Sequence, residues 1–199
     1  MKRIGILGGS FNPAHGGHRR VSIAALDRLG LDEVWWMVSP QNPLKSAAGM
    51  APLAARLASA HAAARHPRIR VVALEEQMGT RFAVDTVQAL QRNFPAYRFI
   101  WLMGADNLAE LHRWHDWRRF ARAVPIAVFA RPGYGGGSRR SPAMAWLRRW
   151  RHASRGARDW TRWTLPGLVL IDIRLDARSA TAIRRQQPDW AERLELHED

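Results

Sequence analysis

The sequence predicts an α/β fold in which helices flank a mainly parallel sheet. Short apolar runs recur along the chain, stretches of helical periodicity separate them, and a glycine-rich turn joins the first run to the first such stretch. Apolar runs without polar alternation are typical of strands buried on both faces. Parallel strands are connected by right-handed crossovers, so we expect a Rossmann-like, doubly wound sheet.

Six apolar runs are predicted strands. They span residues 4–7, 33–38, 70–74, 98–103, 126–130 and 168–173. Ligands of doubly wound sheets bind at the carboxyl ends of the strands, near the point where the strand order reverses. The loops that follow these runs are therefore the first places to look for a site.

The stretches between the runs are predicted helices. They span residues 18–29, 52–65, 84–93, 107–112, 114–121 and 181–187, with a short C-terminal helix over 188–196. Residues 133–162 interrupt the alternation, because they open with a glycine-rich stretch and continue with many arginines and tryptophans. We predict one domain over residues 1–199, with 133–162 as a basic insertion packed on the outside of the sheet.

Composition excludes several classes of protein. The chain has 199 residues, 47% of them hydrophobic, which supports a folded globule. It has no cysteine, which excludes disulfides and thiolate metal sites. No run approaches the roughly 20 apolar residues that span a bilayer, and the run after the basic N-terminus is too short for a signal peptide. We expect a cytoplasmic protein without membrane contact.

The chain is strongly basic. Thirty-one Lys and Arg face 17 Asp and Glu, giving a formal charge of +14. Such a field attracts polyanions, including nucleotides. Much of the excess lies in residues 139–162, outside the motifs described below, and an arginine-rich genome would produce the same bias. We therefore do not expect a nucleic-acid partner.

The most informative segment is residues 8–18, Gly-Gly-Ser-Phe-Asn-Pro-Ala-His-Gly-Gly-His. Its position between a predicted strand and a predicted helix aims backbone N–H groups and a helix N-terminus at one point, which suits phosphate. His15 and His18 are three residues apart and share one helix face. Imidazoles can stabilise charge on phosphoryl oxygens, so the segment suggests phosphate chemistry. The alternative is an ordinary glycine turn with a capping histidine.

A second segment offers similar chemistry. Ser179 is a natural N-cap, and Thr181 and Arg184 share a face of the helix that follows. Two hydroxyls, a helix N-terminus and a guanidinium form a possible phosphate cradle. Taken alone, the segment is better explained as helix capping with a surface arginine.

Residues 8–18 resemble the nucleotidyltransferase superfamily that carries an H-x-G-H motif. The longer pattern, G-G-S-F-N-P-x-H-x-G-H, is most similar to the nicotinate-nucleotide adenylyltransferases. The second segment resembles that family's I-S-S-T-x-[IL]-R signature. Here Arg178 replaces an apolar residue and Ala180 replaces a serine, which removes one hydroxyl.

The resemblance implies roles for particular residues. His15, His18, Lys45 and Arg184 are the implied catalytic residues. The implied ATP-binding residues are Gly8, Gly9, Ser10, Phe11, His18, Gly104, Asp106, Ser179, Thr181 and Arg184. The implied nicotinate mononucleotide-binding residues are Asn12, Lys45, Thr86 and Trp117. Mg²⁺ is expected to arrive with ATP, and no protein metal site is expected.

Several of these matches are softer. Phe82 and Ala83 replace the tyrosine and threonine of the family's Y-T-x-x-T segment, which weakens the substrate assignment at Thr86. Trp117 is preferred to Trp114 as the tryptophan that stacks on the pyridine ring, although core packing explains both. Lys45 could be a solvated loop lysine, Asp106 could be a helix N-cap, and Arg56 is a weaker match to another family position.

The resemblance implies adenylyl transfer from ATP to nicotinate mononucleotide, giving deamido-NAD and pyrophosphate. Three alternatives stay open: nicotinamide mononucleotide as acceptor, phosphopantetheine as acceptor, or a non-catalytic nucleotide- or RNA-binding protein. The nearby histidines His112 and His115 are not expected to bind zinc, because no further ligands converge in sequence. The sequence does not predict the oligomeric state.

Overall fold

A computed structural model of the protein describes residues 1–40, 49–130, 140–173 and 180–195. Within these residues the strands form one seven-stranded sheet of order β3-β2-β1-β4-β5-β7-β6, in which every neighbouring pair is parallel. The strands are β1 (Lys2–Gly9), β2 (Glu33–Val38), β3 (Ile69–Val72), β4 (Tyr97–Gly104), β5 (Ile126–Ala130), β6 (Arg151–His152) and β7 (Leu168–Asp172). The predicted α/β class is confirmed.

The strand order reverses at β1. The chain runs outward from β1 to β2 and β3, then returns to place β4 on the other side of β1. The α-helices of the described residues are α1 (Gly16–Arg28), α2 (Leu53–Ala64), α3 (Leu74–Gln77), α4 (Ala83–Asn93), α5 (Ala105–Glu110), α6 (Trp117–Ala123), α8 (Pro142–Leu147), α9 (Ala180–Gln186) and α10 (Glu192–Glu195). The carboxyl ends of β1 and β4 therefore meet at a topological switch, where doubly wound sheets bind ligands.

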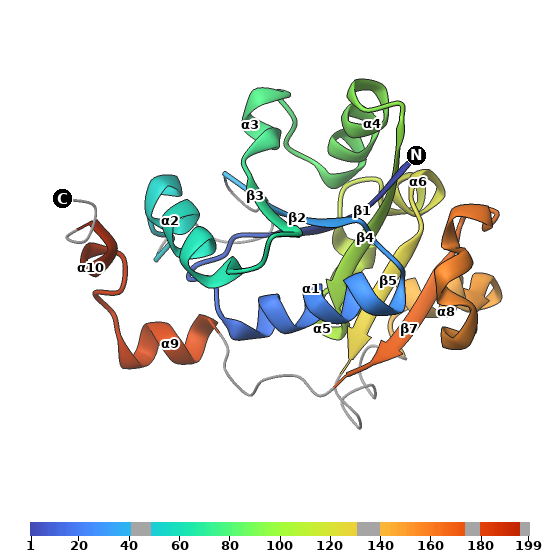
Figure 1. Ribbon diagram of the computed structural model, residues 1–199. Coiled ribbons are helices and arrows are strands. Elements are labelled where there is room, and N and C mark those ends of the chain that lie inside the picture. Colours follow the sequence, from blue (N-terminus) through green and yellow to red (C-terminus); the bar gives the residue numbers. More distant parts are fainter. Residues whose placement is uncertain (41–48, 131–139, 174–179, 196–199) are drawn as a thin grey trace.

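Two apolar cores lie on opposite faces of the sheet. One contains buried side chains of α4, α5, α6 and α8 packed against β1, β2, β4 and β5. The other contains side chains of α1 and α2, together with Trp160, packed against the opposite face. Figure 1 shows α3 and α4 on one side of β1 and β2, with α1 on the other. This two-faced burial is the reason that the strands are continuous apolar runs.

The described part of the predicted insertion, residues 140–162, is integrated into the fold. It forms α8, the 3₁₀ helices Arg148–Trp150 and Ser154–Arg162, and the edge strand β6, which pairs with β7. Met144 and Leu147 are buried in one core and Trp160 in the other. The placement of this segment outside the sheet is therefore corrected, because its apolar side chains complete both cores.

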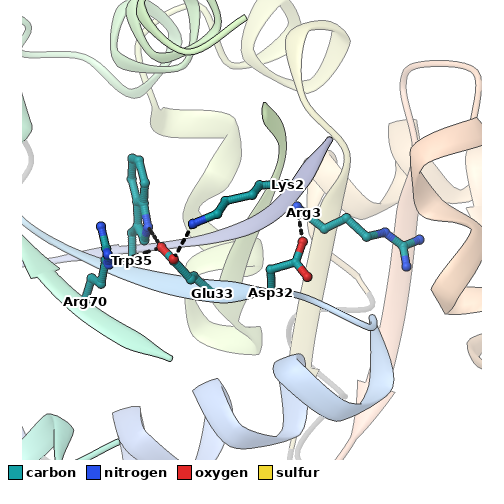
Figure 2. A network of polar contacts seen from close by, with 6 residues as sticks. All are labelled: Lys2, Arg3, Asp32, Glu33, Trp35 and Arg70. Carbon is teal, nitrogen blue, oxygen red and sulfur yellow. Dashed lines mark hydrogen bonds and ion pairs between the residues drawn. The ribbon is translucent and has the colours of Figure 1, made fainter. Parts of the chain in front are cut away.

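A polar network ties the strands together at their amino ends. Glu33 accepts a hydrogen bond from Lys2 Nζ at 2.8 Å and one from Trp35 Nε1 at 2.9 Å, and it lies 3.3 Å from Arg70 Nε. The carboxylate of Asp32 accepts a hydrogen bond from the backbone N–H of Arg3 at 2.7 Å. Figure 2 shows these residues gathered where β1, β2 and β3 begin. The predicted phosphate motif lies at the opposite end of β1.

Candidate active site

The turn after β1 has the predicted strand–turn–helix form. β1 ends at Gly9, and α1 begins at Gly16 with His15 as its N-cap. A methyl group at Gly8 would lie 2.8 Å from Cζ2 of Trp101, so a side chain at this position would displace the indole. The turn is therefore built around a glycine that lets β1 approach Trp101 of β4.

The two histidines form a capping box. His15 Nδ1 accepts a hydrogen bond from the Gly17 N–H at 3.0 Å, and His18 Nδ1 accepts one from the His15 N–H at 3.1 Å. Their ring centroids are 4.0 Å apart. Because each Nδ1 is an acceptor, each neutral ring carries its proton on Nε2, which makes Nε2 a donor. Each histidine therefore caps α1 through Nδ1 and can donate a hydrogen bond through Nε2. Helix capping and phosphate binding are compatible roles for these two residues.

His18 is held neutral. Burial, followed by the proximity of His15, lowers the pKa of His18 to about 3. Its ring packs against Phe11 at 4.8 Å and against Trp36 at 5.9 Å between centroids. At neutral pH, His18 is therefore an uncharged hydrogen-bond donor and not a cation.

Phe11 lies with its ring in the core, packed against His18. Its side chain is only 2% exposed, and its ring stacks on Trp36 at 5.2 Å. Its φ of 47° lies in the left-handed region, which few residues other than glycine adopt. Since the ring belongs to the core, it is not available to stack on a nucleotide.

The second predicted phosphate-binding segment contacts the first through Arg184. Arg184 of α9 donates from Nη1 to the carbonyl oxygen of Asn12, and its Nη2 lies 3.4 Å from Thr181 Oγ1. The structure thus brings together two motifs that are 172 residues apart in sequence. Lys45 and Ser179, which the sequence also assigns to this site, lie outside the described residues.

Asn12 has a structural partner for both ends of its amide. Its Nδ2 donates to the carbonyl oxygen of Gly49 at 2.9 Å, and its Oδ1 accepts from the Ala51 N–H at 3.2 Å. The side chain is 6% exposed. Asn12 therefore links the turn after β1 to the chain that enters α2. Because both ends of its amide are used in this link, its side chain is not assigned to bind nicotinate mononucleotide.

Arg56 of α2 is buried beneath the same turn. Its guanidinium donates to the carbonyl oxygens of Ser10 at 2.9 Å, Ser39 at 2.6 Å, Pro40 at 2.8 Å and Ala51 at 2.9 Å. The side chain is 1% exposed, and burial lowers its pKa. Sequence reasoning gave Arg56 only a weak family match, because nothing in a helical sequence shows which arginine is buried.

Gly104 and Asp106 lie at the carboxyl end of β4, the strand that pairs with β1 at the topological switch. Gly104 ends β4 and is the N-cap of α5, and a side chain at Gly104 would collide with the Asp106 carboxylate. Asp106 is exposed, and it lies in the first turn of α5, not at its N-cap. The N-cap alternative for Asp106 is therefore wrong, and its carboxylate is accessible at the carboxyl end of β4.

Thr86 lies in the first turns of α4, as predicted, but its groups are used internally. Its Oγ1 lies 3.1 Å from Glu75 Oε1, 3.0 Å from Thr80 Oγ1 and 3.1 Å from the carbonyl oxygen of Phe82. Its N–H donates to the same carbonyl, and the residue is fully buried. Direct contact between Thr86 and a ligand is therefore not supported.

The start of α4 nevertheless keeps donors for an anion. The N–H groups of Ala83 and Val84 occupy the first turn, where a helix offers no internal acceptor. Phe82, the N-cap residue, stacks on His115 with centroids 4.2 Å apart. The turn before α6 thus lies against the start of α4.

The two candidate tryptophans have different surroundings. Trp114 packs on Trp101 at 6.2 Å between centroids, and Trp101 in turn lies against Gly8. Trp117 instead packs edge-on against Trp146 of α8 at 5.2 Å, with Arg118 over its ring. Trp114 is therefore linked to the phosphate turn through Trp101, whereas Trp117 is linked to α8.

The described ranges contain no group of three or more His, Cys, Asp or Glu side chains arranged to hold a metal ion. His112 Nδ1 is buried, and no hydrogen-bond partner for it lies within those ranges. In the same part of the chain, no helix is both long and apolar enough to cross a membrane.

Comparison with known proteins agrees with this geometry. Residues 6–186 match the model of the cytidylyltransferase-like family. A protein of Erythrobacter litoralis named "Probable nicotinate-nucleotide adenylyltransferase" is 59% identical over 96% of this chain and 87% of its own length. A protein of the same name from Parvibaculum lavamentivorans is 51% identical, over 92% of each chain.

A solved structure has the same fold. The nicotinic acid mononucleotide adenylyltransferase of Plasmodium falciparum, complexed with NaAD, superposes with a TM-score of 0.66 at 17% identity, covering 93% of this chain and 83% of that one. The match to the family model and the identity to the curated relatives place the chain more closely. It belongs to the cytidylyltransferase-like family and, within it, to the nicotinate-nucleotide adenylyltransferases.

Proposed function

We propose that the protein transfers the adenylyl group of ATP to nicotinate mononucleotide, giving deamido-NAD and pyrophosphate. The observation that carries this proposal is the contact between Arg184 and Asn12, which joins the two phosphate-binding segments at the switch point of the sheet. The names of the relatives agree with this reaction. We assign the whole activity to a single domain over residues 1–199.

In this reaction an oxygen of the mononucleotide phosphate attacks the α-phosphorus of ATP. A new P–O bond forms in line with the bond that breaks, and pyrophosphate leaves with that electron pair. The chain has no cysteine, and no covalent intermediate is needed. Catalysis is therefore positioning and charge stabilisation.

The residues of the phosphate turn would supply the donors. His15 and His18 would donate from Nε2 to phosphoryl oxygens, because Nδ1 of each ring accepts from the backbone. Arg184 would add a positive charge, since His18 is neutral. Lys45, Ser179 and Thr181 are proposed from sequence to neutralise or bind further phosphate oxygens, and Asp106 to bind a ribose hydroxyl.

The acceptor ring would lie toward α4. The N–H groups of Ala83 and Val84, at the positive end of the helix, suit the carboxylate of a nicotinate ring. Trp114 would contact the ring face, with His115 and Phe82 at its edge. This assignment replaces Thr86 and Trp117 as ligand contacts.

Mg²⁺ would enter bound to ATP. ATP phosphates commonly supply several ligands of Mg²⁺, and the other ligands are often water molecules. When bound, the ion neutralises phosphate charge. No protein step is assigned to it.

The test measures pyrophosphate release with ATP and Mg²⁺ in the presence of nicotinate mononucleotide, nicotinamide mononucleotide or phosphopantetheine. We expect turnover with both mononucleotides and a higher kcat/KM for nicotinate. Preference for nicotinamide would overturn the α4 assignment, and turnover with phosphopantetheine alone would overturn the substrate class. Binding without turnover for every acceptor would indicate a non-catalytic protein.

A further inference from the structure

Two buried ionisable side chains meet at one serine. The carbonyl oxygen of Ser39, directly after β2, accepts a hydrogen bond from Arg56 at 2.6 Å, and the Ser39 side chain is hydrogen-bonded to Glu75 of α3. Glu75 is 7% exposed and Arg56 is 1% exposed. Neither forms an ion pair with any residue of the described ranges. Buried ionisable groups are costly unless their polar atoms are paired or hydrogen-bonded, so these two side chains depend on the hydrogen bonds of this cluster.

Glu75 also holds the start of α4. Its carboxyl Oε1 lies 3.1 Å from Thr86 Oγ1, and its backbone carbonyl accepts from the Thr80 N–H at 2.9 Å. The two threonine hydroxyls are 3.0 Å apart, and Thr86 Oγ1 is 3.1 Å from the carbonyl oxygen of Phe82, the N-cap residue. The orientation of the first turn of α4 therefore depends on Glu75.

The network continues to the phosphate turn. The Ser39 N–H donates to the carbonyl oxygen of Gly9 at 2.9 Å, and Arg56 joins Ser39 to Ser10. The loops after β1 and β2 and the start of α4 are thus connected through Ser39 and Glu75. These are the segments to which the proposed function assigns the phosphates and the pyridine ring.

Glu75 is an acceptor within this cluster. The Thr86 hydroxyl donates to Glu75 Oε1 at 3.1 Å, while the Phe82 carbonyl oxygen already accepts from the N–H groups of Asp85 and Thr86. Burial raises the pKa of Glu75, and the hydrogen bonds with Ser39 and Thr86 oppose this shift without cancelling it.

We propose that Glu75 is a positioning residue that sets the acceptor preference: through Ser39 and Thr86 it fixes the first turn of α4 beside the chain that follows β2, and so holds the N–H groups of that turn where they can receive the pyridine carboxylate. The inference rests on the proposed function, because it concerns the binding of that acceptor.

Four variants test the inference. Glu75→Ala removes the link, Thr86→Val removes one hydroxyl at nearly constant shape, and Glu75→Gln keeps a hydrogen-bond acceptor on a side chain of the same size. Glu33→Ala removes a carboxylate at the amino end of the sheet and is the matched control (Figure 2). For each, KM is measured separately for ATP, nicotinate mononucleotide and nicotinamide mononucleotide, and folding is checked by thermal melting.

We expect Glu75→Ala and Thr86→Val to raise the KM for nicotinate mononucleotide by about tenfold or more, because a misplaced α4 turn no longer meets the carboxylate. The KM for ATP should change by less than about threefold. Glu75→Gln should restore the nicotinate preference, and Glu33→Ala should leave all three KM values unchanged.

An equal rise in the KM for ATP and for the acceptor would overturn the inference, as would a Glu75→Gln variant as impaired as Glu75→Ala. If Glu75→Ala does not fold, Thr86→Val and Glu75→Gln decide the matter by the same criteria. A wild-type protein without turnover would remove the proposed function and this inference together, whereas normal turnover with unchanged selectivity in the variants would remove only the inference.

Discussion

Arg56 Nη1 donates hydrogen bonds to the carbonyl oxygens of both Ser10 and Ser39, at 2.9 and 2.6 Å. The first carbonyl lies in the turn after β1 and the second directly follows β2, so one buried guanidinium sets the spacing of two loops at the carboxyl edge of the sheet. A planar fork with five donors suits this task better than a single ammonium group.

Replacing this fork should destabilise the protein. Arg56→Met keeps the apolar stem but leaves four carbonyl groups without their donor, so we expect the free energy of unfolding to fall by about 3 kcal/mol. Urea denaturation at neutral pH measures this change. The unfolding free energy of Arg56→Lys should lie between those of the wild type and Arg56→Met. A loss below about 1 kcal/mol for Arg56→Met would show that water replaces the hydrogen bonds at little cost.

His18 should be essential for turnover and dispensable for folding. His18→Ala removes a preorganised donor to the phosphates, so kcat should fall by about 10²-fold or more. Pyrophosphate release measures the rate, and circular dichroism checks that the helix content is kept. Activity near that of the wild type would show that the phosphate site lies elsewhere.

The buried His18 should also make stability depend on pH. Its pKa is about 3 in the folded protein and 6.5 in an ordinary environment, so the unfolded chain binds more protons between these values. Stability should therefore be lost as the pH falls from 6.5 toward 3. His18→Asn keeps an acceptor near the His15 N–H without a titratable group, and its unfolding free energy should fall less steeply over this range. Parallel curves for the two proteins would contradict the assignment.

Replacing Trp114 and replacing Trp117 should have different effects on the KM for nicotinate mononucleotide. Trp114→Leu removes the indole that packs on Trp101 near the phosphate turn, and it should raise the KM for nicotinate mononucleotide by about threefold to tenfold. Trp117→Leu alters the contact with Trp146 of α8 and should leave that KM unchanged. The opposite result would restore Trp117 as the ring contact.

Much of the fold was predictable because its signals are local. β2 and β5 have the predicted bounds, since a strand covered on both faces reads as an apolar run between polar loops. β6 could not be predicted, because a two-residue edge strand carries no periodicity. The third predicted strand was too long, since Leu74 begins α3 in place of ending β3.

The site was predictable only where one segment carries the whole pattern. The turn containing His15 and His18 combines glycines, histidines and a helix start within 11 residues. Arg56 lies in a predicted helix and Glu75 in a predicted loop, and in neither place does the sequence show that a charged side chain points inward. Thr86 has the expected position near the start of α4, but it is buried and its hydroxyl contacts neighbouring protein groups. The sequence does not show this burial, which decides whether a hydroxyl contacts a ligand or a neighbouring side chain.

The central claim is direct transfer of the adenylyl group between two phosphate-binding segments. A single-turnover experiment with ATP labelled at the α-phosphate, together with nicotinate mononucleotide, tests it most directly. We expect the label to pass from ATP to deamido-NAD, with unlabelled pyrophosphate released and no label on the protein. Label retained on the protein, or no labelled dinucleotide at all, would contradict it.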